Sequence, residues 1–313
     1  MGFRRSLVRI QSPRLGGIAA RLAVPPVGFP REANVDTGAA LPRRVTLHVE
    51  RTPYGLLQVV HDRGKNVRML MHDLTCHGMQ SLDPGREDEP LAYYTRSGPL
   101  GDVFTGWTAR RGAGGGRVAV LGLGVGAIAA YARPGDRFTF FEIDPAVAAV
   151  ARDARFFTHV ARCRGACDIV VADGLEGARG LRDGALDLLV VDAFVDAGVP
   201  PHLVSAEALA LYFRKLAAGG LAVVHLGWSD DAAARLGEAQ AGTRRRGREA
   251  GLCCGTRADA GVTPAESAAG KLRSRWAVLA SRPRRGHGHG HGHGHGHGTD
   301  VAWLASDPRW SWT

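Results

Sequence analysis

The stretch with the clearest chemical signature joins a glycine-rich loop to an acid 20 residues later. An apolar run at 118–121 predicts a buried strand, and a second run at 138–141 ends on Glu142. The glycines of the loop between them are Gly122, Gly124 and Gly126. Glycine lets backbone N–H groups approach a ligand closely, and a carboxylate can accept two hydrogen bonds from a ribose diol. This spacing is typical of nucleotide-binding βαβ units, so the sequence predicts a nucleoside site.

Two further acids stand in comparable positions. Asp173 follows an apolar stretch at 168–172, and Asp192 follows another at 186–191; both stretches are predicted strands. Ligands of parallel sheets bind beyond the carboxyl ends of the strands. A carboxylate there can bind a cationic amine and accept its proton during a reaction. Aspartate is also frequent as a loop cap, which is the alternative role for Asp192.

The elements that must position these acids alternate along the chain. The predicted helices cover 127–132, 145–152 and 205–217, and the later strands cover 221–226, 252–256 and 275–281. Alternation of this kind predicts an α/β fold with a doubly wound, mostly parallel sheet of the Rossmann-like type.

The residues before this unit have another pattern. Alternation and turns over 45–80 predict strands, and 100–110 predicts a helix. We therefore expect a disordered or non-native extension at 1–44, a small N-terminal β domain at 45–110, a Rossmann-like nucleoside-binding catalytic domain at 111–285, a Gly-His low-complexity insertion at 286–298 and a C-terminal tail at 299–313.

The two ends carry unusual segments. Residues 8–13, VRIQSP, are what the T-arm of a transfer RNA gene encodes when it is translated, so we expect a start codon assigned too far upstream. Histidines alternate with glycine from His287 to His297, and we interpret this repeat as a flexible insertion rather than a loose nickel or zinc site. The chain ends at Thr313 after an aromatic stretch, and we expect this end to be incomplete.

Charge and cysteine content exclude several classes of protein. The formal net charge is +10, yet residues 45–230 carry 19 basic and 21 acidic side chains. The positive charge thus lies near the ends, whereas a nucleic-acid-binding domain carries it on its folded face. No run of 18 apolar residues predicts a membrane helix. Five scattered cysteines fit free thiols in a reducing cytosol. We expect a cytoplasmic protein that binds neither nucleic acid nor membrane and holds no metal.

Several short motifs, taken together and in order, are specific. They are VERTPYGLLQVV at 49–60, HGMQ at 77–80, YYTRSGPLG at 93–101, VLGLGVGA at 120–127, EIDP at 142–145, ADG at 172–174 and DLLVVDAFVDAGVPPHL at 187–203. This series resembles the spermidine synthase (polyamine aminopropyltransferase) family, especially bacterial spermidine synthase-like domains often fused to transporter-like segments. The resemblance covers about 45–230.

That resemblance implies a small N-terminal β domain, a domain of the AdoMet-methyltransferase fold, and a homodimer. It also implies transfer of an aminopropyl group from decarboxylated AdoMet (S-adenosylmethionine) to a small-molecule amine. The residues it assigns are Glu142 for the ribose, Asp173 for the adenine amino group, Gln80 near the nucleoside, Asp192 as the base, and Tyr94 and Asp196 for the amine substrate.

One departure from the family leaves the reaction open. The glycine loop of the family usually carries an aspartate, which binds the aminopropyl ammonium, where this chain has Val125. Without that charge, preference for the decarboxylated donor loses its electrostatic basis. The alternatives are an AdoMet-dependent methyltransferase on the same fold and a degenerate, non-catalytic nucleoside-binding module.

Overall fold

A computed structural model describes residues 42–195, 198–227, 230–245, 252–281 and 301–312 of the chain. The predictions for the N-terminal extension up to residue 41, for the Gly-His segment and for Asp196 concern residues outside these ranges. The statements below that something is absent refer to the described residues alone.

The N-terminal part forms an antiparallel sheet of four strands in sequential order. They are β1 (Arg44–Thr52), β2 (Gly55–Asp62), β3 (Val67–His72) and β4 (Thr75–Ser81). Asp62 is buried at the second turn and accepts hydrogen bonds from the guanidinium groups of Arg43 and Arg44. Residues 43 and 44 therefore belong to the folded part, which corrects the predicted boundary after residue 44.

The larger sheet has eight strands in the order β12-β10-β11-β9-β8-β5-β6-β7. Its parallel strands are β5 (Arg117–Leu121), β6 (Arg137–Glu142), β7 (Ala166–Val171), β8 (Leu186–Val191) and β9 (Leu216–His225). Three antiparallel strands extend it, namely β10 (Leu252–Asp259), β11 (Ser274–Ser281) and β12 (Ser311–Trp312). The mixed α/β architecture with a mostly parallel sheet is thus confirmed.

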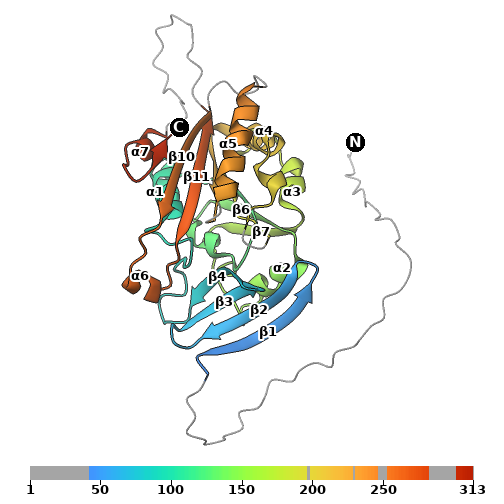
Figure 1. The fold of residues 1–313 in the computed structure, drawn as a ribbon, viewed down its shortest axis with the longest axis vertical. Helices are drawn as coiled ribbons and strands as arrows, with labels where there is room; N and C mark the ends of the chain where they lie inside the picture. The colour runs from blue at the N-terminus through green and yellow to red at the C-terminus, as the bar shows by residue number, and fades with distance from the viewer. Residues whose placement is uncertain (1–41, 196–197, 228–229, 246–251, 282–300, 313) are drawn as a thin grey trace, which may run out of the picture. The chain divides into compact units, whose positions relative to one another are not determined.

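Alternating side chains of the parallel strands build a separate core on each face of this sheet. On one face, Val118 and Val120 pack with α1 (Pro99–Arg111), α2 (Pro145–Arg152) and the N-terminal sheet. On the other face, Ala119 and Leu121 pack with helices that follow β7, β8 and β9. Those helices are α3 (Gly174–Gly180), η2 (Pro201–Val204), α4 (Ala206–Lys215) and α5 (Asp230–Arg245). Figure 1 shows the small sheet at one end of the larger α/β unit. Two short helices, α6 (Pro264–Ala268) and α7 (Ala302–Ala305), flank β11 in sequence.

Three elements differ from the prediction. The helix expected at 127–132 is a 3-10 helix, η1 (Ala127–Tyr131), which ends before the turn at Pro134. Helix α3 was not predicted, since its sequence GLEGARG is rich in glycine and has low helix propensity. Strand β9 begins at Leu216, inside the predicted helix over 205–217, and continues through the glycines expected to separate the two.

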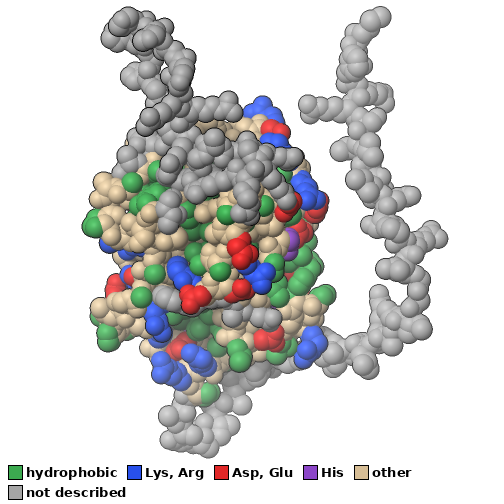
Figure 2. All heavy atoms as spheres, turned by 45° about the horizontal axis from the view of Figure 1, so that its top comes forward, with side chains coloured by type: hydrophobic (Ala, Val, Ile, Leu, Met, Phe, Trp, Pro, Cys, Tyr) green, Lys and Arg blue, Asp and Glu red, His purple; other side chains and the backbone are tan. Residues whose placement is uncertain are grey.

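Cysteine pairing also departs from the expectation of free thiols. Cys163 and Cys167, in the segment between α2 and β7, form a disulfide with their Cα atoms 6.3 Å apart. Cys76 is not part of a disulfide, and its thiol donates a hydrogen bond to the carbonyl of Gly78. Among the described residues, no helix has the length and apolar content needed to cross a membrane. Figure 2 shows acidic and basic side chains intermixed on one face, in keeping with the balanced charge of the central residues.

Candidate functional site

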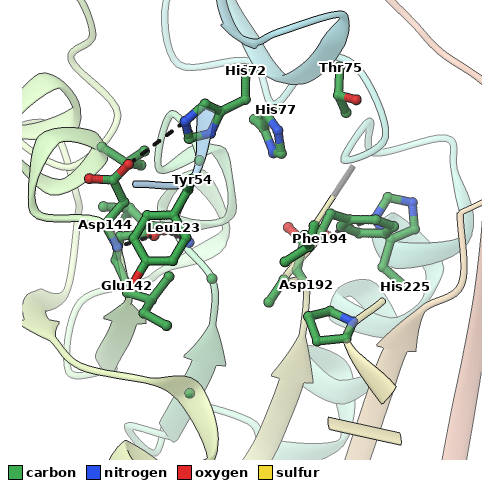
Figure 3. Close-up of a pocket in the computed structure, with 18 of the residues that line it drawn as sticks. Tyr54, His72, Thr75, His77, Leu123, Glu142, Asp144, Asp192, Phe194 and His225 are labelled. Atoms are coloured by element: carbon green, nitrogen blue, oxygen red, sulfur yellow. Dashed lines mark hydrogen bonds and ion pairs between the residues drawn. The ribbon is translucent and has the colours of Figure 1, made fainter. Parts of the chain in front are cut away.

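A cavity of about 590 Å³ lies between the carboxyl ends of the parallel strands and the edge of the N-terminal sheet. Its lining includes six of the site residues predicted from the sequence, namely Tyr94, Gly122, Gly124, Glu142, Asp173 and Asp192. Figure 3 shows Glu142, Asp144 and His72 on one side of this cavity and Asp192, Phe194 and His225 on the other. The fold therefore brings residues as far apart in the sequence as His72 and His225 into one cavity.

The glycine loop is confined between β8 and β4. Gly122 and Gly124 have positive φ angles of 103° and 54°, which L-residues with a side chain rarely adopt. A Cβ on Gly122 would overlap the carbonyl of Asp192, and one on Gly124 would overlap the carbonyl of His77. The loop therefore has to be glycine at both positions for the backbone to lie along the cavity floor.

Glu142 ties this loop to the next strand and helix. One carboxylate oxygen accepts a hydrogen bond from Leu123 N at 3.0 Å, and the other accepts one from Asp144 N at 2.9 Å. The side chain is buried, and this burial raises the pKa of the carboxyl group against the opposing effect of the two backbone donors. Each oxygen retains a second lone pair, so the group can still accept hydrogen bonds from a diol in the cavity.

Two histidines and an acid beside Glu142 were not nominated from the sequence. Asp144 caps α2 by accepting from Ala146 N, and its other oxygen lies 3.8 Å from His72 Nε2. Burial, together with the charge of His72, lowers the pKa of His77 to about 4. His77 is therefore neutral near pH 7. Both histidines come from the antiparallel sheet, and nothing in the local pattern of β3 and β4 links them to a site at the edge of another sheet.

Asp173 acts as a helix cap as well as a cavity residue. Its Oδ1 accepts hydrogen bonds from Leu175 N and Glu176 N at the start of α3. Its Oδ2 lies 3.3 Å from Nε2 of His202, which is half exposed. The carboxylate thus has one oxygen fixed by the helix and the other turned towards a polar partner at the cavity.

Asp192 forms a pair with a histidine that sequence analysis missed. Asp192 Oδ1 lies 2.7 Å from Nδ1 of His225, and both side chains are about 95% buried, with 5% and 4% exposure. Burial raises the pKa of Tyr94 well above its usual value, and the Asp192 carboxylate raises it further through its charge and a hydrogen bond. His225 is the last residue of β9, so the rule that marked Asp173 and Asp192 at strand ends would also have found it.

Three described positions of interest do not line the cavity, and a fourth lies outside the described residues. Gln80 is buried, and its amide bonds with Thr158 and the carbonyl of Glu87. Gly126 precedes η1, outside the cavity wall. Val125 is 1% exposed, packs against Gly78 and is not among the residues that line the cavity. Asp196 lies outside the described residues.

No group of three or more His, Cys, Asp or Glu side chains in the described residues is arranged to hold a metal ion. The cavity is mostly apolar, and acids, histidines and aromatic rings line it. Such a set can bind a nucleoside and a cationic amine.

The antiparallel N-terminal sheet and the mostly parallel α/β sheet together form a fold that this chain shares with solved spermidine synthases. Solved structures with this fold include a probable spermidine synthase from Corynebacterium glutamicum ATCC 13032, which is 20% identical, with a TM-score of 0.54 over 77% of this chain and 81% of that one. The spermidine synthase of Thermotoga maritima is 12% identical, with a TM-score of 0.51 over 75% and 72% of the two chains.

A third similar structure is a spermidine synthase in complex with the transition-state analogue AdoDATO; it is 12% identical, with a TM-score of 0.51 over 74% and 72% of the two chains. By sequence, neither a protein-family model nor a curated protein matches this chain. The structural similarity covers the spermidine synthase fold and gives no support to a fusion with transporter-like segments.

Proposed function

We propose that this protein is an aminopropyltransferase that moves the aminopropyl group of decarboxylated AdoMet to a small amine, with Asp192 as the base. The observation that supports it most is the position of Asp192. This carboxylate lines the same cavity as the glycine loop and Glu142, on the side away from Glu142. A base near the reacting carbon and an acid for the ribose are what such a transfer needs. The fold similarity to spermidine synthases, one of them bound to AdoDATO, is consistent with it.

In the proposed complex, Glu142 accepts hydrogen bonds from the ribose hydroxyls of the donor. Asp173 keeps Oδ2 as an acceptor for the adenine amino group, next to His202. Both acids already accept backbone hydrogen bonds, so their orientation is set before the ligand enters and little entropy is lost on binding.

The amine acceptor would bind at the opposite side of the cavity. Asp192 attracts its ammonium group, while the rings of Tyr93 and Phe194 supply apolar and π surface for a cation. An ammonium group cannot attack, so Asp192 accepts one proton from it, and the neutral amine attacks the methylene carbon next to the sulfonium. The new C–N bond forms as the C–S bond breaks, and the electron pair of that bond passes to sulfur to give a neutral thioether. The alkylated nitrogen leaves as an ammonium group, and Asp192 returns its proton to water.

Substitution of Asp192 by asparagine tests this role. The asparagine oxygen can still accept the hydrogen bond from His225, so we expect the fold to persist. Loss of a general base commonly lowers turnover by roughly 10²- to 10⁴-fold, and we expect a loss in this range. Affinity for methylthioadenosine should stay near that of the wild type, because Glu142 and Asp173 hold the nucleoside. The matched control is Asp168→Asn, which changes an exposed acid on β7 outside the cavity.

Turnover close to wild type in Asp192→Asn would remove this residue from the mechanism. A combined fall in turnover, ligand affinity and melting temperature would instead identify it as a structural cap. Calorimetry with AdoMet, decarboxylated AdoMet and methylthioadenosine then separates the reactions. Preference for AdoMet would favour a methyltransferase, and binding of all three without turnover of any amine would favour a non-catalytic nucleoside-binding module.

A further inference from the structure

We propose that His225 is a positioning residue for Asp192: its Nδ1–H donates to the carboxylate and fixes the direction in which that carboxylate meets the acceptor amine. The kinetic part of this inference rests on the proposed function. The structural part, a neutral imidazole with its proton on Nδ1, concerns the protein alone.

The contact between the two side chains is short and shielded from water. His225 Nδ1 and Asp192 Oδ1 are 2.7 Å apart in surroundings that leave both side chains almost wholly buried. A hydrogen bond from a fixed donor to a charged acceptor is strong in such surroundings. The backbone N–H of Asp192 also donates to the carbonyl of Leu121 at 2.8 Å, so both the main chain and the side chain of the acid are held.

Burial of the other ring nitrogen selects the tautomer. His225 Nε2 is buried and has no hydrogen-bond partner among the described residues. A proton on Nε2 would therefore be a buried donor without an acceptor, which is costly both in the Nε2–H tautomer and in the imidazolium. The tautomer with its only proton on Nδ1 avoids this cost, because that proton goes to Asp192.

Neighbouring rings hold the imidazole in the plane that this contact requires. The His225 ring stacks on Trp276, with 4.2 Å between the ring centroids and an interplanar angle of 6°. The Phe194 ring makes a T-shaped contact with the His225 ring, with 4.8 Å between their centroids. Trp276 is fully buried and is the register partner of His225 across the antiparallel pair of β9 and β11. Sheet register thus sets the stack, and the stack sets the direction of Nδ1.

This arrangement gives the carboxylate a defined orientation before any substrate enters. Tyr94 adds a second hydrogen bond to Asp192 from another part of the chain. A carboxylate has lone pairs for about four donors, so acceptor sites remain for an ammonium group. An oriented base lowers the entropic cost of reaching the reactive geometry, and a displacement of about 1 Å can cost roughly 100-fold in rate.

Two substitutions separate the hydrogen bond from the packing. His225→Phe keeps an aromatic ring for the stack on Trp276 but removes the donor. His225→Asn loses the stack but places an amide nitrogen close to the position of Nδ1. We expect kcat to fall roughly 10- to 100-fold in His225→Phe, with the amine KM and methylthioadenosine affinity changed less than about 3-fold. We expect His225→Asn to recover a measurable part of kcat. His48→Phe, on β1 outside the cavity wall, is the control.

Imidazole ¹⁵N NMR of the ligand-free protein supplies a readout that needs no turnover. We expect His225 to show a protonated Nδ1 and a bare Nε2 near pH 7, and we expect Asp192→Ala to abolish this preference. A wild-type imidazolium or Nε2–H tautomer would overturn the inference, as would wild-type kcat in His225→Phe. Equal losses of kcat in both His225 variants, tracking their melting temperatures, would reduce the residue to a packing role. If no amine is turned over at all, the proposed function fails. The tautomer of His225 measured by NMR then tests the structural part of the inference by itself.

Discussion

Glu142 has two tasks in this structure, and substitutions separate them. Its carboxylate accepts hydrogen bonds from Leu123 N and Asp144 N at 3.0 and 2.9 Å while only 8% of the residue is exposed. Leaving a buried donor unsatisfied costs about 1–3 kcal/mol. Glu142→Ala frees two such donors, and cavity water can replace part of the loss, so we expect the free energy of unfolding to fall by about 2–4 kcal/mol. Glu142→Gln retains one acceptor oxygen and should lose about half as much.

The second task is to hold the ribose of an adenosyl ligand. A hydrogen bond to a charged group contributes about 1.5–3 kcal/mol, so methylthioadenosine should bind Glu142→Ala roughly ten- to hundred-fold more weakly. Urea unfolding measures the first effect and calorimetry on the folded variants measures the second. Glu176→Ala, which removes an exposed acid of α3, is the control and should change stability by less than about 0.5 kcal/mol.

Either result can refute the reasoning about Glu142. An unchanged unfolding free energy in Glu142→Ala would mean that the carboxylate does not hold the glycine loop. A lower unfolding free energy with wild-type ligand affinity would restrict Glu142 to a scaffolding role and remove it from the nucleoside site.

Two further outcomes depend on burial. Burial lowers the pKa of His159 to about 4, so the unfolded chain takes up this proton first on acidification and stability is lost as the pH falls from about 6.5 to 4. His159→Phe should remove about 2 kcal/mol of the change in unfolding free energy between pH 7 and 5, measured by thermal unfolding. The control, His202→Gln at an exposed position, should leave that change intact. An unaltered pH dependence of stability in His159→Phe would place His159 in contact with water. Val125→Asp should lower stability by about 3 kcal/mol or more, because Val125 packs among apolar side chains. A stable variant that prefers decarboxylated AdoMet would return residue 125 to the donor site.

The sequence located the main elements because their signals are local. The apolar runs before Glu142 and Asp192 form β6 and β8, since short runs bounded by turn residues can be recognised within a few positions. The N-cap at Ser205 and the Pro145 start were predictable for the same reason. The start of β9 was not predictable, because pairing with β8, and not local propensity, extends that strand through Gly219.

The amino-acid sequence by itself determined which residues stand at the carboxyl ends of the strands. Strand length and the two-residue alternation of side chains can be recognised from neighbouring residues alone. Tertiary structure alone decided how those residues are used. Only the register of β9 on β11 brings Trp276 against His225 and turns that histidine towards Asp192. Only the packing of β4 on the glycine loop buries Val125. Both contacts join segments from separate parts of the chain. The direction of a side chain at such a contact depends on how whole strands and helices pack, and the residue pattern within one strand or helix does not reveal it.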